Sequence, residues 1–196
     1  MADKPSYLKT LNAIANGERR AGIYLKAWAE KTQDEAVKQV LTTVALRETE
    51  HAWAFEKRVC ELGFGLQDRP DPKFEKNMEI VQADCSDLEK FEALGYKKLN
   101  PAEERPNPFQ DIFNDTTIDI QTGALLGRYV AEEHDSGRLL QGCFDALCAQ
   151  SNSASSNGSS ANGMGDVTLA DVCGAVQQLT DQVCALQGEV AELRTS

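Results

Sequence analysis

Residues 40–59, VLTTVALRETEHAWAFEKRV, decide how this chain of 196 residues folds. Apolar side chains recur in this stretch at intervals of three and four, which is the spacing of one face of an α-helix. The same face includes Glu48 and His51, and charged side chains seldom lie in a core unless they are paired or bind a metal ion. The stretch therefore predicts a helix from about Gln33 to Leu62 with ionisable groups on its apolar side.

The preceding segment has the same helical period and also carries a glutamate on its apolar face. A helix from about Ser6 to Glu30 places Glu18 on that face. Only residues 31–33 connect the two segments, so we expect two antiparallel neighbouring helices. This arrangement brings Glu18 to about the same level as Glu48 on the second helix.

Two further helical segments lead to an all-α prediction. One covers residues 74–99, and it is broken near residues 84–87, where Ser86 has the pattern of a helix-capping box. The other runs from about Asp119 to Ala149. Its glycines weaken its intrinsic helicity, so packing against the other helices has to stabilise it.

Each of the four expected helices carries one glutamate on its apolar stripe, and the second adds a histidine three residues later. Carboxylate oxygens combined with an imidazole nitrogen suit iron or manganese. For the third helix, Glu89 is an alternative to Glu92. The predicted metal ligands are Glu18, Glu48, His51, Glu92 and Glu133.

Three segments resemble the ferritin-like di-iron superfamily, and most closely its rubrerythrin-type members. Residues 15–30, ANGERRAGIYLKAWAE, and residues 40–59 resemble its first helical pair, and residues 128–140, RYVAEEHDSGRLL, resemble its fourth helix. The resemblance covers residues 6–149. It implies a ferritin-like four-helix bundle, in which glutamates from two helices and a Glu-x-x-His motif from each of the other two surround two metal ions.

The resemblance also implies roles for these residues and an activity. Glu18 would be a terminal ligand, Glu48 and Glu133 would be bridging ligands, and His51 would be a nitrogen ligand. The complete site would hold two iron ions, with manganese as an alternative. We expect oxygen- or peroxide-linked redox chemistry or oxidation of ferrous iron, with an external electron donor for any reductase cycle.

The second half of the predicted site departs from the family pattern. Three residues after Glu133 the chain has Ser136 instead of histidine, and His134 points away on a regular helix. A pair formed by Glu132 and Asp135, or a local π-bulge, would be a substitute. Two intact first halves meeting across a dimer is a further alternative.

The C-terminal part of the chain predicts two separate regions after a helical domain of residues 1–149. Residues 150–165, QSNSASSNGSSANGMG, have the composition of a flexible linker. Residues 166–196 contain a heptad pattern that favours a parallel coiled coil, and therefore a homo-oligomer or capture of a partner protein. Docking on the bundle is the alternative for this segment. The a and d positions are Leu169, Val172, Val176, Leu179, Val183, Leu186, Val190 and Leu193.

Composition narrows the class of protein further. The net charge is −11 and Lys and Arg do not cluster, so we expect no nucleic-acid or membrane partner. No apolar run approaches the roughly 20 residues that span a bilayer, and no apolar signal core is present. We therefore expect a cytoplasmic protein. The six cysteines form no CxxC pair, which argues against a zinc-ribbon or rubredoxin-type module.

Two functional hypotheses follow from these patterns. The first is a non-haem di-iron or manganese protein, and possible enzyme, with oxidase or peroxidase chemistry. The second is a ferritin-like scaffold or binding protein that has lost metal activity and acts through its C-terminal helix. The departure at Ser136 motivates the second hypothesis. Iron storage in a closed shell is a weaker third hypothesis.

Overall fold

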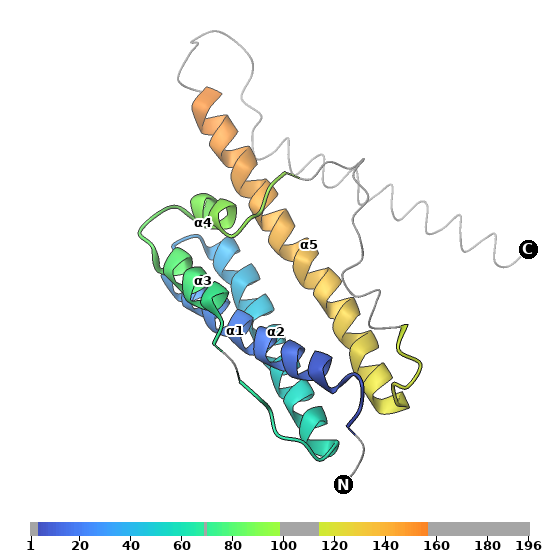
Figure 1. Cartoon of the computed structure of the whole chain (residues 1–196). Helices are drawn as coiled ribbons and strands as arrows, with labels where there is room; N and C mark the ends of the chain where they lie inside the picture. Colours follow the sequence, from blue (N-terminus) through green and yellow to red (C-terminus); the bar gives the residue numbers. More distant parts are fainter. Residues whose placement is uncertain (1–3, 69, 99–113, 157–196) are drawn as a thin grey trace, which may run out of the picture. The chain divides into compact units, whose positions relative to one another are not determined.

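The computed structural model describes residues 4–68, 70–98 and 114–156, and each regular element within them is an α-helix (Figure 1). The all-α prediction is therefore confirmed for this part of the chain. The helices are α1 (Leu8–Lys31), α2 (Glu35–Glu61), α3 (Pro72–Gln82), α4 (Asp87–Ala93) and α5 (Ile120–Ser156).

Helices α1 and α2 form the antiparallel pair that the sequence predicts (Figure 1). The Asp34 side chain accepts hydrogen bonds from the backbone N–H groups of Ala36 and Val37, which caps the start of α2. Gly63 has a φ of 85°, a conformation that favours glycine, and it ends α2 where the sequence predicts a C-cap. Local sequence signals therefore set both the start and the end of α2.

The third predicted segment consists of two short helices instead of one long helix. Ser86 and Glu89 form a complete capping box at the start of α4, so the predicted break is confirmed. α3 ends at Gln82 and α4 begins anew at Asp87. The new start changes which residues of α4 face inward, and this affects the predicted ligand on this segment.

Helix α5 lies beside both α1 and α2 (Figure 1). Asp119, the residue before α5, contacts both of these helices. It accepts hydrogen bonds from Tyr7, the N-cap residue of α1, and from Arg58 of α2. The helix continues to Ser156, past the predicted end at Ala149 and into the segment predicted as a linker. The predicted coiled coil of residues 166–196 lies outside the described residues.

Two apolar clusters occupy the interior, one toward each end of the helix pair. The first surrounds Leu11, Phe55 and Leu126, and the second surrounds Trp28, Leu41 and Phe144. Along all three long helices, the residues between these clusters include buried polar groups. Those groups are Glu18 on α1, Glu48 and His51 on α2, and Ser136 on α5.

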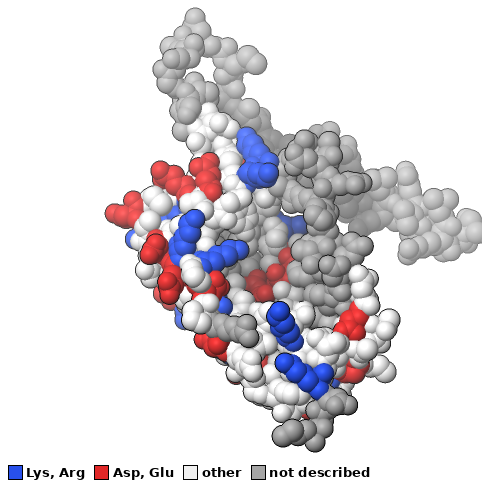
Figure 2. Space-filling model, in the orientation of Figure 1, with Lys and Arg blue, Asp and Glu red and all other residues white. Residues whose placement is uncertain are grey.

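Hydropathy and surface charge characterise the exterior of the described part of the chain. None of its helices is both long and apolar enough to cross a membrane. On the face shown in Figure 2, basic side chains are interspersed with acidic ones. Surface ion pairs such as Arg19–Glu56, at 2.7 Å, add little stability because water screens them.

Candidate metal centre

Four ionisable side chains from three helices meet in the polar layer between the two apolar clusters. They are Glu18 of α1, Glu48 and His51 of α2, and Glu133 of α5. Each offers one atom that can bind a metal, and these atoms all lie within 4.8 Å of one another. The structure therefore brings together four of the five residues that the sequence predicts as ligands.

The packing of α1 against α2 explains how Glu18 reaches the pair on α2. Gly22, one turn after Glu18, lies against α2, and a Cβ atom at Gly22 would be 2.6 Å from Thr49 Oγ1. The same Cβ atom would be 3.2 Å from the backbone oxygen of Ala45. Only glycine permits this close approach of the two helices beside the site.

The imidazole of His51 is the common neighbour of the three carboxylates in the group. Its Nδ1 atom is 3.4 Å from Glu133 Oε1, 3.6 Å from Glu48 Oε2 and 3.9 Å from Glu18 Oε2. None of these three contacts has the geometry of a hydrogen bond in the described structure. The group is also deeply placed, because the exposed fractions of Glu48 and His51 are 4% and 3%.

Three buried atoms of this group have no hydrogen-bond partner among the described residues: Glu48 Oε2, His51 Nδ1 and Glu133 Oε1. Buried polar atoms are normally paired, and an unpaired buried carboxylate oxygen is costly. A cation bound between these atoms would satisfy all three at once. The donor set therefore fits a metal ion, and the buried group can hold one.

The electrostatics of the group favour positive charge at its centre. Burial opposes the charged form of His51, but the nearby carboxylates of Glu133, Glu18, Glu48 and Glu132 outweigh it and raise its pKa to about 12. Burial, together with Glu18 and Glu133, raises the pKa of Glu48 to about 9. Burial also opposes ionisation of Glu18, yet its contacts with His51, Glu48 and Tyr129 lower its pKa.

Two side chains of α5 orient the ligands without belonging to the group. Glu132 Oε2 is 2.7 Å from His51 Nε2, and because a carboxylate oxygen accepts, Nε2 carries a proton and Nδ1 faces the group. Tyr129 donates a hydrogen bond of 2.8 Å to Glu18 Oε1, and its ring meets the His51 ring edge-on. Burial raises the pKa of Tyr129, so its hydroxyl keeps the proton that it donates.

The structure does not bring the fifth predicted ligand, Glu92, to the other four. Glu92 is exposed on α4 and does not belong to the group. Because the capping box restarts the helix at Asp87, Lys90 and Phe91 are the residues of α4 that face inward. The alternative, Glu89, is also exposed, and its carboxylate accepts from Ser86 in that box.

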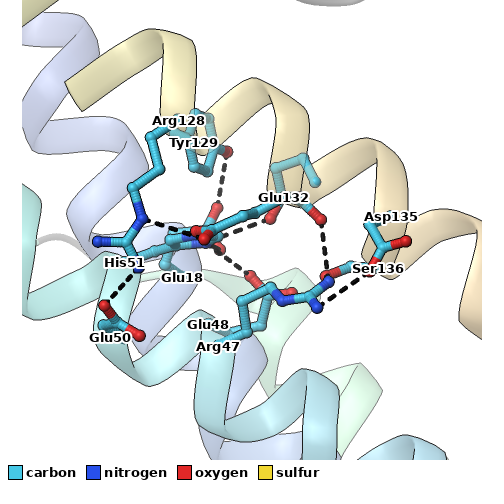
Figure 3. A network of polar contacts seen from close by, with 11 residues as sticks. Glu18, Arg47, Glu48, Glu50, His51, Arg128, Tyr129, Glu132, Asp135 and Ser136 are labelled. Carbon is cyan, nitrogen blue, oxygen red and sulfur yellow. Dashed lines mark hydrogen bonds and ion pairs between the residues drawn. The ribbon is translucent and has the colours of Figure 1, made fainter. Parts of the chain in front are cut away.

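Ser136 occupies the position where the family pattern has a histidine, and it contacts an arginine of α2. Ser136 is 3% exposed, and Arg47 donates a hydrogen bond of 3.1 Å to its hydroxyl (Figure 3). Arg47 also donates to the backbone oxygen of Glu132, at 3.2 Å, and pairs with Asp135 at 3.0 Å. α5 is a regular α-helix throughout this region, with His134 exposed, so no π-bulge turns another side chain inward.

Sequence reasoning missed the roles of Arg47 and Glu132. Glu132 was a candidate ligand with Asp135, whereas the structure uses it to hold the ring of His51. The signal in the sequence was present but ambiguous, because Glu132 and Glu133 are adjacent acidic residues that point in different directions on a helix. Arg47 gave no signal, since an arginine beside an apolar stripe is normally a solvated charge.

Comparison with protein-family models, with curated proteins and with solved structures gives no match to this chain. The described part of the chain is an all-helical fold with a buried carboxylate–histidine group that can hold a metal ion. The resemblance to ferritin-like proteins stays a prediction from the sequence.

Proposed function

We propose that this chain is a ferritin-like metal protein that binds iron, or manganese, and uses it in redox chemistry with oxygen or peroxide. The observation that carries the proposal is the set of three unpartnered, buried ligand atoms on Glu48, His51 and Glu133. His51 Nδ1 lies within ion-pair distance of Glu48 Oε2 and Glu133 Oε1, yet none of the three atoms has a hydrogen-bond partner, and one cation bound among them would satisfy all three.

The chemistry of the donors selects the class of metal. Three carboxylate oxygens and one imidazole nitrogen are typical of iron and manganese, and no thiolate contributes to the group. The cysteines that the structure describes lie elsewhere: Cys60 and Cys85 are exposed, and Cys143 and Cys148 are half-buried. Bound iron would supply an ion that exchanges electrons with oxygen or peroxide.

The protein's own residues bind and orient in this proposal. Glu132 fixes the imidazole of His51 so that Nδ1 points to the centre, and Tyr129 fixes one oxygen of Glu18. The apolar clusters on both sides restrict water at the group. These contacts would preorganise the ligands, so the metal would bind without a large rearrangement of the helices.

Metal loading tests the proposal directly. The full chain is stripped of metal with a chelator and incubated with Fe²⁺ without oxygen, or with Mn²⁺. After removal of free metal, we expect bound metal to remain with the wild type and with Glu92→Gln, which changes an exposed glutamate outside the group. We expect Glu48→Gln to retain little. A wild type that binds neither metal would overturn the proposal.

The redox part of the proposal needs its own measurement. We expect the iron-loaded chain to change its absorption spectrum on exposure to oxygen or peroxide, and to consume peroxide when a reductant is supplied. Glu48→Gln is the matched control because it keeps the size of the side chain and removes one ligand oxygen. Tight metal binding with no spectral change would contradict the redox chemistry and leave only metal binding.

A second candidate is a scaffold or binding protein that keeps this fold without metal activity. The contacts of Arg47 with Ser136 and Asp135 favour it, because they occupy the position where the resembling family has a histidine. This candidate predicts that Fe²⁺ and Mn²⁺ do not raise the melting temperature of the full chain. A metal-dependent rise that Glu48→Gln abolishes would contradict it.

The heptad pattern of residues 166–196 supports a further part of the proposal, a homo-oligomer formed through this segment. We expect Leu179→Glu and Leu186→Glu, which place charges in the apolar seam, to lower the oligomeric state in sedimentation experiments. Gln178→Glu, outside the seam, is the control. An unchanged oligomeric state in the seam variants would contradict this part.

A further inference from the structure

We infer that the centre holds one metal ion per chain, and that Arg47 and Ser136 close the position of a second ion. This inference rests on the proposed function, because it assumes that the group binds a metal. It goes beyond the resemblance, which implies two ions, and it depends on contacts particular to this chain. Three observations carry it.

The first observation is how close the candidate ligand atoms lie to one another. Atoms bound to one ion at about 2.0–2.2 Å lie about 3–4.4 Å from one another. The distances from His51 Nδ1 to the three carboxylate oxygens, 3.4, 3.6 and 3.9 Å, lie in this range, and the spread of the four ligand atoms, within 4.8 Å, is only slightly wider. A single ion therefore accounts for the unpartnered atoms of Glu48, His51 and Glu133.

The second observation is that the substitute carboxylates near the missing histidine are already paired. Glu132 uses one oxygen for His51 Nε2 and the other for Arg128 Nε, at 2.7 and 3.0 Å. Asp135 uses one oxygen for Arg47 and the other for Arg138. Neither carboxylate has an oxygen that is left for a second metal ion without breaking an existing contact.

The third observation is the positive charge of Arg47, which lies beside Ser136. The guanidinium of Arg47 is held by the hydroxyl of Ser136, the backbone oxygen of Glu132 and the carboxylate of Asp135. An arginine remains charged at any ordinary pH, so it repels a second cation. A serine hydroxyl is also a poorer ligand for iron or manganese than an imidazole.

The number of bound ions tests this inference on the full chain. Metal-free protein is incubated with excess Mn²⁺, free metal is removed, and manganese and protein are quantified. We expect one ion per chain and an uncoupled Mn²⁺ EPR signal that accounts for all of the bound metal. Two ions per chain with a coupled signal would overturn the inference and leave the proposed function intact. No bound metal would overturn the proposed function, and the inference with it.

Two variants separate the roles of Arg47 and Ser136. Ser136→Ala removes the hydroxyl with little change in volume, and we expect it to keep one ion per chain. Loss of the ion in this variant would show that Ser136 is a ligand and overturn the inference. The double variant Arg47→Gln/Ser136→His removes the charge and supplies the missing imidazole.

We expect the double variant to bind two ions per chain and to show a coupled EPR signal. Its circular dichroism is compared with that of the wild type to establish that it folds. A folded double variant with one ion would show that Arg47 and Ser136 do not set the number of ions, and would overturn that part of the inference. If the double variant does not fold, the number of ions bound by the wild type and by Ser136→Ala tests the inference.

Discussion

The polar layer between the apolar clusters has two halves, one on α2 and one on α5 around Ser136. They differ in whether their buried polar atoms have partners. On α2, Glu48 Oε2 and His51 Nδ1 are buried without a hydrogen-bond partner among the described residues. On α5, Glu133 belongs to the same group, whereas Ser136, Glu132 and Asp135 are held by arginines or by His51. Neutralised groups stabilise a fold, whereas unpartnered groups mark the place where a ligand is expected. We therefore assign binding to the α2 half together with Glu133, and closure to the part of α5 around Ser136.

The largest expected effect comes from removing a ligand on the α2 half. We expect His51→Ala or Glu48→Gln to weaken binding of Fe²⁺ or Mn²⁺ by more than about a hundredfold, because losing only a residue that supports a ligand costs about 10–100-fold. Competition with a chelator of known affinity measures it. Ser136→Ala is the matched change on the α5 half, and an equal loss there would break the comparison.

A smaller effect is expected from the residue that orients the imidazole. We expect Glu132→Gln to weaken metal binding by about 10–100-fold, because the imidazole of His51 loses its charged partner at Nε2. The same chelator competition measures this change. Asp135→Asn, on the same helix and paired with Arg47, is the control, and a larger loss from that control would contradict the assigned roles.

The close contact of α1 and α2 next to the site can be tested through stability. We expect Gly22→Ala to lower the free energy of unfolding by about 1–3 kcal/mol, because its Cβ atom would meet Thr49 Oγ1 at 2.6 Å. Gly17→Ala is the control, since nothing lies within 4 Å of a Cβ atom there. We expect that variant to keep or gain stability, by up to about 1 kcal/mol. Urea unfolding of both measures the difference.

The smallest effect concerns the contacts of Asp119 with α1 and α2, away from the metal group. The hydrogen bond with Thr122 lowers the pKa of Asp119, and further contacts with Tyr7 and Arg58 act in the same direction against burial. A lowered folded-state pKa stabilises the fold above the unfolded-state pKa of about 3.9, and this contribution is lost as the pH falls further.

We therefore expect Asp119→Asn to lower stability at pH 7 by up to about 1 kcal/mol, because the side chain is partly exposed and water screens its charge. The difference from the wild type should shrink below about pH 4, where the aspartate of the unfolded chain is protonated. Thermal unfolding across this pH range measures it. A difference that grows toward low pH would contradict the role of the charge.

Periodicity and capping signals in the sequence predicted much of the described fold. The long helices and the break before α4 follow from local patterns, such as the apolar spacing of residues 40–59 and the capping box at Ser86. The four candidate ligands that the structure brings together also follow from these patterns, since each lies on an apolar stripe: Glu18, Glu48, His51 and Glu133.

The remaining features depend on contacts between helices that no local pattern contains. Glu92 continues the stripe of an unbroken helix, but the restart at Asp87 turns it to the solvent. Arg47 lies beside the apolar stripe of α2 and could not be assigned before Ser136 and Asp135 were placed opposite it. The close approach at Gly22 is likewise visible only when Thr49 faces it.

A crystal structure of the manganese-loaded full chain tests the central claim most directly, because anomalous scattering locates each metal ion. The account predicts a single anomalous peak among Glu18, Glu48, His51 and Glu133, with Arg47 still bound to Ser136. No peak among those four residues, or a second peak beside Ser136, would contradict it.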